Sequence, residues 1–143
     1  MRLGIRSAVM AVLINQEGKV LIGSSPRDGG YKFPQGGREP FEDVITCIKR
    51  ELREELNFIV NDGDIEQVYD QKVSYEFPDD GYYIFDSQEL TVVKIRFQSH
   101  AELTPQDDEF DELLWIKPEE LCNYDSHFRG EAYQKALEIC GLM

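Results

Sequence analysis

The spacing of apolar positions in the middle of the chain predicts an amphipathic helix over residues 42–56. Apolar side chains recur there at every fourth position, namely Val44, Ile48, Leu52 and Leu56. This spacing is close to the roughly 3.6-residue turn of an α-helix, so these side chains share one face. Asn57 follows, and asparagine tolerates the left-handed backbone conformation in which many helices end. We therefore expect the helix to stop before Asn57.

Two apolar segments before this helix predict a β-hairpin. Residues 7–14 are apolar and contain β-branched side chains, and residues 19–23 repeat this character after the turn-forming sequence Asn-Gln-Glu-Gly at 15–18. Residues 24–30 contain one proline and two glycines, so we expect a loop there. This loop leads into residues 31–37, which end in a pair of glycines.

The rest of the chain is predicted to add strands and a second helix. Strands are expected at residues 65–77, 82–85, 90–97 and 113–116. A short helix is expected over residues 118–121, because proline suits the first turn of a helix. A second amphipathic face is formed near the C-terminus by Tyr133, Ala136, Leu137 and Cys140. Together these elements predict the α+β class, with a mixed sheet between helices.

The length and composition are typical of one globular domain. A chain of 143 residues usually forms a single compact core, so we expect one domain over residues 1–143. No apolar run approaches the roughly 20 residues of a membrane span, and no export signal is visible. We therefore expect a cytoplasmic protein that does not bind membranes. Cys47, Cys122 and Cys140 are widely spaced, which argues against a disulfide framework and favours buried reduced thiols.

The charge of the chain restricts the partners that it can bind. It has 15 Lys and Arg residues against 28 Asp and Glu residues, for a formal net charge of -13. A field of this sign repels long polyanions, so we expect no binding to duplex DNA. A nucleic acid could be bound only locally, at one of its ends. A metal-binding pocket, by contrast, tolerates this charge. The sequence is compatible with either a monomer or a homodimer.

Three glutamates on the predicted helix are candidates for a metal site. Glu51, Glu54 and Glu55 stand at positions i, i+3 and i+4, so we expect their carboxylates to emerge together, opposite the apolar stripe. Each like-charge pair at this spacing costs an isolated helix roughly 0.2–0.5 kcal/mol, which suggests a nearby cation. Hard oxygen ligands in this number suit Mg²⁺ or Mn²⁺. The alternative is a solvated acidic face, relieved by neighbouring basic residues.

The sequence around this helix resembles the Nudix box. That pattern is G-x5-E-x7-R-E-U-x-E-E-x-G-U, where U is a bulky apolar residue. The match begins at Gly36, continues through Glu42 and ends with Arg-Glu-Leu-Arg-Glu-Glu-Leu-Asn-Phe at 50–58. Asn57 replaces the usual glycine, and Phe41 stands where many members carry glycine. Asparagine is the substitute that the first of these positions accepts best, and neither change removes a carboxylate.

The resemblance implies the Nudix fold and a hydrolase that uses a divalent metal to cleave a pyrophosphate linkage. It implies that Glu51, Glu54 and Glu55 hold the metal, which we expect to be Mg²⁺ with Mn²⁺ as an alternative. One of these residues or a later glutamate would be the general base. Arg50 is expected to orient the glutamates through charge-assisted hydrogen bonds. Glu42 is expected to support the loop or a second metal.

Further matches point to one branch of the family, the diadenosine polyphosphate hydrolases and bacterial RNA 5′-pyrophosphohydrolases. The entrance to the box reads Phe-Pro-Gln-Gly-Gly at 33–37, as in that branch. Additional matches lie on both sides of the box and extend over nearly the whole chain. They are Arg6, Tyr-Glu-Phe-Pro at 75–78, Glu-Phe-Asp at 109–111, Phe-Arg at 128–129, and Tyr133.

This branch resemblance implies roles for five further residues, each with a simpler alternative. Glu109 would assist the metal site, and Arg6 and Arg27 would contact phosphates. Phe128 would stack on a base, and Tyr75 would belong to the same substrate site. Alternatively, Tyr75 and Phe128 pack against their neighbours, and Glu109 is one more solvated acid in an acidic loop. A surface arginine likewise needs no special purpose.

The acidic residues after the box affect the choice of substrate. The branch usually carries basic residues before its central strand, whereas this chain has Asp79, Asp80, Asp86 and Glu89 in that neighbourhood. Dinucleoside polyphosphates fit this charge more comfortably than RNA, although a triphosphate end could still be bound locally. A nucleoside triphosphate pyrophosphohydrolase of the nucleotide-pool-cleaning type is a second hypothesis. A catalytically silent nucleotide-binding sensor is a third, which the intact glutamates oppose.

Overall fold

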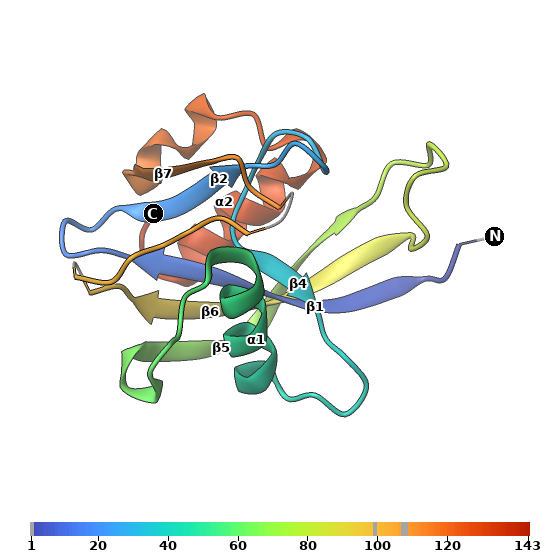
Figure 1. Ribbon diagram of the computed structural model, residues 1–143. Coiled ribbons are helices and arrows are strands. Elements are labelled where there is room, and N and C mark those ends of the chain that lie inside the picture. Colours follow the sequence, from blue (N-terminus) through green and yellow to red (C-terminus); the bar gives the residue numbers. More distant parts are fainter. Residues whose placement is uncertain (1, 99, 107–108) are drawn as a thin grey trace.

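A mixed β-sheet forms the centre of the computed structural model, which describes residues 2–98, 100–106 and 109–143 (Figure 1). Within these residues the sheet contains seven strands: β1 (Ile5–Ile14), β2 (Val20–Ser24), β3 (Tyr31–Lys32), β4 (Gln35–Gly37), β5 (Ile65–Glu76), β6 (Ser87–Arg96) and β7 (Glu112–Ile116). Strand β1 runs parallel to β6 and antiparallel to β2 and β4. The predicted hairpin of the first two strands and the predicted mixed sheet are both confirmed.

Two α-helices cover opposite faces of this sheet (Figure 1). The helices are α1 (Val44–Leu56) and α2 (Gly130–Ile139), with shorter 3-10 helices at η1 (Asp62–Asp64), η2 (Pro118–Asn123) and η3 (His127–Arg129). None of the helices in the described segments is long and apolar enough to cross a bilayer. The predicted α+β class, with a sheet between helices, is therefore confirmed.

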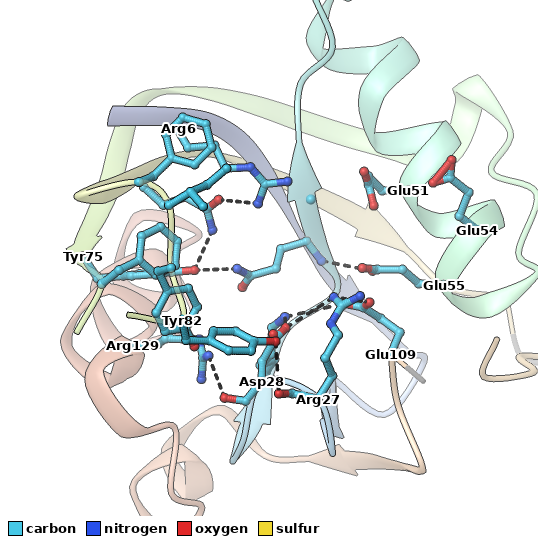
Figure 2. Close-up of a pocket in the computed structure, with 18 of the residues that line it drawn as sticks. Arg6, Arg27, Asp28, Glu51, Glu54, Glu55, Tyr75, Tyr82, Glu109 and Arg129 are labelled. Atoms are coloured by element: carbon cyan, nitrogen blue, oxygen red, sulfur yellow. Dashed lines mark hydrogen bonds and ion pairs between the residues drawn. The ribbon is translucent and has the colours of Figure 1, made fainter. Parts of the chain in front are cut away.

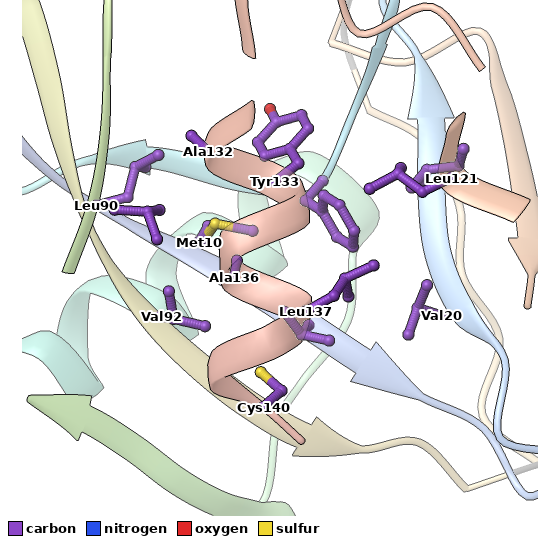
Figure 3. Packing of buried hydrophobic residues seen from close by; sticks show 14 of the residues in the cluster. Met10, Val20, Leu90, Val92, Leu121, Ala132, Tyr133, Ala136, Leu137 and Cys140 are labelled. Carbon is purple, nitrogen blue, oxygen red and sulfur yellow. The ribbon is translucent and has the colours of Figure 1, made fainter. Parts of the chain in front are cut away.

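Strand β1 contributes to two hydrophobic cores because its side chains alternate between the faces of the sheet. Met10 packs with Tyr133 in the core beneath α2, which Figure 3 shows from close by. Leu13 belongs to the opposite core, together with Leu52 of α1. A strand that is buried on both faces must be apolar at consecutive positions. This requirement explains the uninterrupted apolar run at residues 8–13, all of which are fully buried.

Helix α1 begins two residues later than its apolar pattern predicts. Asp43 is the N-cap, and its carboxylate accepts a hydrogen bond from the Thr46 amide at 2.7 Å. This bond satisfies one of the free amides of the first turn, so the helix proper starts at Val44. The helix ends at Asn57, whose φ of 52° and ψ of 36° lie in the left-handed region. The predicted helix end is therefore confirmed.

The strand predicted at residues 82–85 is wrong, because this segment is a loop. The loop is closed at its base, where the Phe77 amide donates to the Asp86 carbonyl at 2.9 Å. The Leu3 amide donates to the Ile84 carbonyl at 2.8 Å, which ties the loop to the N-terminal segment. The aromatic residues that suggested a strand instead line a cavity, so their spacing reflects the cavity and not a sheet face.

The cysteines follow the expectation of buried thiols in two cases out of three. Cys47 and Cys140 are buried in the two cores, whereas Cys122 is exposed, so the expectation is wrong for Cys122. Cys122 lies on η2, which buries Pro118 and Leu121 against the core. Cys122 follows Leu121 directly, so its side chain points away from the face of η2 that is buried, and the thiol is exposed.

Candidate active site

A cavity of about 640 Å³ lies between α1 and the loop that follows β5. Figure 2 shows carboxylates on one side of this cavity and aromatic side chains on the other. We call the first side the carboxylate wall, which consists of Glu51, Glu54, Glu55 and Glu109. We call the second side the aromatic wall, which consists of Tyr75, Phe77, Tyr82, Tyr83 and Phe85. The cations that line the same cavity are Arg6, Arg27, Lys32 and Arg129.

The three glutamates of α1 differ in exposure. Glu51 is 9% exposed and Glu55 is 4% exposed, whereas the Glu54 side chain is 51% exposed. The expectation that all three emerge opposite the apolar stripe is therefore wrong for Glu51 and Glu55. At about 100° per residue, Glu55 falls between Val44 and Ile48 at the margin of the apolar stripe, and Glu51 lies beside them. Strand β4 packs against α1 and contributes to their enclosure. Two carboxylates are thus enclosed by protein, and the third reaches solvent.

Glycine and backbone amides of β4 allow the helix to approach this closely. A Cβ atom on Gly36 would overlap the carboxylate of Glu51, so a larger residue here would displace that carboxylate from its position. The backbone amide of Gln35 donates a hydrogen bond to Glu55 Oε1 at 3.2 Å. The glycine that opens the box therefore leaves room for the Glu51 carboxylate beside β4, and its backbone does not need the left-handed conformation.

The buried carboxyl groups hold their protons more tightly than free glutamate does. Burial, opposed by Arg50 and reinforced by Glu54, raises the pKa of Glu51 to about 7. Burial also raises the pKa of Glu55 well above its usual range, and the nearby carboxylates of Glu109 and Glu51 add to this effect. Crowded acids of this kind favour either a proton or a cation between them.

Arg50 connects three of the acidic side chains. Its Nε and Nη2 atoms donate to the two carboxylate oxygens of Glu42, both at 2.8 Å. Its Nη1 atom donates to Glu51 at 2.9 Å and to Glu54 at 3.2 Å. The bond to Arg50 lowers the pKa of Glu42 to about 2. Glu42 also accepts a bond from the Glu39 amide at 3.0 Å, so it supports the loop before α1.

Glu109 faces the α1 glutamates from a separate loop and is held by two cations. Its Oε2 atom pairs with Arg27 at 2.5 Å, and its Oε1 atom lies 3.5 Å from Lys32 Nζ. Lys32 is only 4% exposed and also pairs with Asp28 at 2.6 Å. Glu109 is thus not a solvated acid, because its side chain is 12% exposed. Arg27, expected at phosphates, has a half-exposed side chain at the same end of the cavity.

A buried chain of hydrogen bonds joins the aromatic wall to Arg6 and to the β4 strand. The Tyr75 hydroxyl accepts bonds from the amides of Gln35 and Gln88, both at 2.6 Å. Gln88 in turn accepts a bond from Arg6 Nη1 at 3.0 Å. Gln35 accepts a further bond from the hydroxyl of Tyr133. Tyr75 is 7% exposed, so it lines the cavity mainly as the hub of this network.

Phe128 does not lie on the described lining of the cavity. Its ring packs 5.5 Å from that of Tyr75 and 5.8 Å from that of Tyr83, so it supports the aromatic wall from behind. The most accessible ring of the wall is Tyr82, which is 57% exposed. The Tyr82 hydroxyl lies 3.5 Å from the Arg27 carbonyl, across the cavity in Figure 2.

The fold and these residues can be compared with known proteins. A family model described as NUDIX domain matches residues 4–136. The chain belongs to the Nudix family. The resemblance that was inferred from the box residues is therefore confirmed.

Several relatives cover almost the whole Nudix domain. An RNA pyrophosphohydrolase of Francisella tularensis subsp. mediasiatica (strain FSC147) is 28% identical over 142 residues, which cover 94% of this chain and 92% of the relative. An RNA pyrophosphohydrolase of Campylobacter jejuni is 26% identical over 93% of this chain and 90% of the relative. The solved structure of an Ap4A hydrolase from C. elegans has the same fold, with a TM-score of 0.68, 14% identity, and coverage of 93% and 95% of the two chains.

The donor atoms of the carboxylate wall fit a divalent cation. Glu51, Glu54 and Glu55 offer hard carboxylate oxygens, and burial, together with the neighbouring carboxylates, raises the pKa of both Glu51 and Glu55. Among the described residues, no three acidic, histidine or cysteine side chains already converge on one point. Arg50 donates hydrogen bonds to both Glu51 and Glu54, so these two carboxylates already share a cationic partner.

The sequence did not identify several residues that build this Nudix site. Asp28 and Lys32 form the ion pair that holds Glu109, and no local pattern marks them. Arg129 is 2% exposed and donates to the carbonyls of Asp28 and Gly29 at 3.3 and 3.1 Å, so it fixes the loop that carries Arg27. Within the dipeptide Phe128-Arg129, the resemblance implies a role for the phenylalanine, whereas the structure places the arginine on the cavity lining.

Proposed function

We propose that this Nudix protein hydrolyses a pyrophosphate linkage in a nucleotide substrate with the help of Mg²⁺. The observation that carries the proposal is the placement of the carboxylate wall and the aromatic wall on opposite sides of one cavity. Carboxylates suit the cation that accompanies a polyphosphate, and aromatic rings suit a nucleobase. One cavity therefore offers matching chemistry for both ends of a nucleotide.

Glu51, Glu54 and Glu55 would hold the cation, with Glu109 assisting them. A bound Mg²⁺ would neutralise phosphate charge and acidify the attacking water, which is the chemistry that this reaction requires. Arg50 would orient Glu51 and Glu54, because its guanidinium donates to both. Pre-positioned charges of this kind lower the reorganisation needed when charge develops on the phosphoryl oxygens.

Arg6 and Arg27, which both line the cavity, would contact the phosphates. Arg6 is held by its bond to Gln88, and Arg27 is anchored by Glu109. Guanidinium groups suit phosphate oxygens because their donors match that geometry. On the aromatic wall, Tyr82 is the ring with the greatest exposure, so we propose that it contacts the base. Tyr75 would position Arg6 through Gln88, and Phe128 would support the wall.

We propose a dinucleoside polyphosphate or a 5′-triphosphate RNA end as the substrate. The relatives at 26–28% identity are named as RNA pyrophosphohydrolases, which supports the second of these. Two of the acidic residues that disfavour RNA, Asp79 and Asp86, lie 3.9 and 3.3 Å from Arg2 and do not line the cavity. Their charges therefore oppose the binding of an RNA end less than the sequence suggests. The net charge of -13 still favours a short substrate over a long strand.

A panel of substrates would test this proposal. The purified protein would be incubated with Mg²⁺ and diadenosine tetraphosphate, a 5′-triphosphate RNA oligomer or single nucleoside triphosphates, and the products would be separated. We expect asymmetric cleavage of the dinucleotide or release of pyrophosphate from the RNA. Turnover of single nucleotides alone would favour the pool-cleaning function. Absence of turnover on every substrate, with nucleotide binding retained, would favour the silent sensor.

A further inference from the structure

A second groove opens beside the cavity, on the side where β1 begins. It consists of a hollow of about 420 Å³ that shares Arg6, Glu51 and Phe85 with the cavity. A hollow of about 530 Å³ continues it past Arg38 to Phe41. Arg6 and Glu51 line both the cavity and the first hollow, so the groove adjoins the cavity at these two residues. A ligand that extends beyond the carboxylate wall therefore has a continuous path to Phe41.

Two arginines along this groove carry charge that no described carboxylate neutralises within 4 Å. Arg6 donates to the amide oxygen of Gln88, and Arg38 donates twice to the Glu42 carbonyl, at 2.7 and 3.2 Å. These neutral acceptors fix the guanidinium groups without cancelling their charge. The Arg38 amide also donates to the Ser7 carbonyl at 2.9 Å, so the backbone holds the two arginines near each other.

The acidic side chains beside Arg38 already have partners. Glu42 binds Arg50 through both carboxylate oxygens, and Asp43 caps α1. Glu39 lies 3.8 Å from Arg50 Nε. The groove is lined by three arginines, Arg6, Arg38 and Arg50, and by four acids, Glu39, Glu42, Asp43 and Glu51, and the charge of Asp43 also acts on Arg38. Arg6 and Arg38 are the guanidinium groups of this groove that no described carboxylate pairs with within 4 Å, so their donors are free to bind the oxygens of a phosphate chain.

Phe41 stands at the far end of the groove in a conformation that its side chain disfavours. Its φ is 64°, in the left-handed region where bulky residues are rare. Its ring is fully exposed and therefore gains nothing from packing in the core. Figure 1 shows the segment between β4 and α1 projecting away from the sheet. An exposed aromatic ring on a strained backbone contributes little to folding, so it is a candidate for ligand contact.

We propose that this groove binds the second nucleoside of a two-ended substrate. Arg6 and Arg38 contact the phosphates that leave the cavity, and the ring of Phe41 stacks on the second base. This inference rests on the proposed function, because it assigns one end of the same substrate to the cavity. It favours a dinucleoside polyphosphate over a single nucleotide, since only the former has a base that reaches Phe41.

Two ligands that differ by one nucleoside would test the proposal. Diadenosine tetraphosphate and adenosine 5′-tetraphosphate would be titrated calorimetrically in the presence of Mg²⁺, with Glu54→Gln in every protein to slow turnover. We expect Phe41→Gly to lower the affinity for the dinucleotide by about tenfold, because one base-stacking contact is lost. The affinity for adenosine 5′-tetraphosphate should not change. Arg38→Gln should weaken both ligands by a few-fold, because both carry the phosphate chain.

Controls separate ligand contact from folding. Phe41→Tyr keeps the ring and should keep the affinity, whereas Ile59→Ala removes an apolar side chain that is 77% exposed elsewhere and should change neither ligand. Phe41→Gly should keep or raise the melting temperature, because glycine adopts a positive φ without steric conflict. Equal affinities of Phe41→Gly and the parent for the dinucleotide would overturn the proposal, as would an equal loss for both ligands. If neither ligand binds the parent protein, both the groove proposal and the proposed function are wrong. If the wild type binds these ligands without hydrolysing them, only the proposed function is wrong.

Discussion

The two walls of the cavity arise from the sequence in different ways. Three members of the carboxylate wall come from a single turn of α1. The aromatic wall is drawn from β5 and the loop that follows it, and it depends on contacts with the N-terminal segment and with η3. A wall built by one helix keeps its geometry when distant segments change. A wall built by several segments can vary in shape, so we expect the carboxylate wall to set the rate and the aromatic wall to set affinity.

The largest effect is expected when a buried carboxylate is neutralised. Glu55→Gln should lower kcat by roughly 100-fold or more, because it removes a charge that the cation requires. The melting temperature of the metal-free protein should stay equal or rise, because a carboxyl group crowded by Glu51 and Glu109 no longer needs to ionise. Steady-state kinetics and thermal unfolding would measure both. Glu131→Gln, on the exposed side of α2, is the matched control, and a similar kcat for Glu55→Gln and this control would contradict the assignment.

Arg50→Lys tests whether the carboxylate wall depends on orientation as well as on charge. Lysine keeps the positive charge but cannot bind Glu42 with two donors while reaching Glu51 and Glu54. Loss of such a supporting partner should lower kcat by roughly 10–100-fold. Arg53→Lys changes an exposed arginine of the same helix and should have little effect. Wild-type kinetics in Arg50→Lys would show that the charge alone suffices.

Tyr75→Phe tests the network behind the aromatic wall. Removal of the hydroxyl leaves the buried amides of Gln35 and Gln88 without their acceptor, which should lower the free energy of unfolding by about 1–3 kcal/mol. Chemical denaturation would measure this change. Since Gln88 also holds Arg6, KM should rise as well. If the variant is as stable as the wild type, the network is less important than its geometry suggests.

Tyr82→Ala tests the part of the aromatic wall that is open to solvent. Loss of one base-stacking ring should raise KM by about tenfold and leave kcat nearly unchanged, because the base is remote from the reacting phosphate. Tyr82→Phe keeps the ring and should retain the wild-type KM. A fall in kcat with no change in KM would reverse the division of roles between the two walls.

The stability of the metal-free protein should also depend on pH. The pKa of Glu51 is raised to about 7 in the folded state from an ordinary value of 4.5, so the folded protein binds more protons in that range. The free energy of unfolding should therefore fall as pH rises from about 4.5 to 7, and Glu55 acts in the same direction. Urea unfolding at pH 5 and pH 7 in EDTA would measure this. A free energy of unfolding that rises from pH 5 to pH 7 would contradict the raised pKa of these two buried acids.

The sequence predicted the parts of the molecule that depend on local spacing. Helix α1, its end at Asn57 and the proximity of its three glutamates follow from helical periodicity and the box pattern. The burial of Glu51 and Glu55 does not follow, because it also depends on the approach of β4 at Gly36. The loop at residues 77–86 could not be predicted either, because the spacing of its aromatic residues is also typical of a strand.

Long-range partners were the hardest to predict. The family resemblance points to Glu109, but its cationic partners Arg27 and Lys32 lie 82 and 77 residues away in the sequence. The bond from Tyr133 to Gln35 spans 98 residues and leaves no trace in local composition. Such pairs are fixed by the topology of the sheet, which a single sequence does not determine.

The dependence of turnover on Mg²⁺ tests the central claim most directly. The rate on the substrate that is cleaved fastest would be measured as Mg²⁺ is titrated into EDTA-treated protein, for the wild type and for Glu54→Gln. We expect the wild-type rate to rise from near zero to a plateau, and we expect Glu54→Gln to lose roughly 100-fold of that plateau or to require far more Mg²⁺. Full turnover without added metal, or an unchanged Mg²⁺ dependence in Glu54→Gln, would contradict the claim that the carboxylate wall holds a catalytic cation.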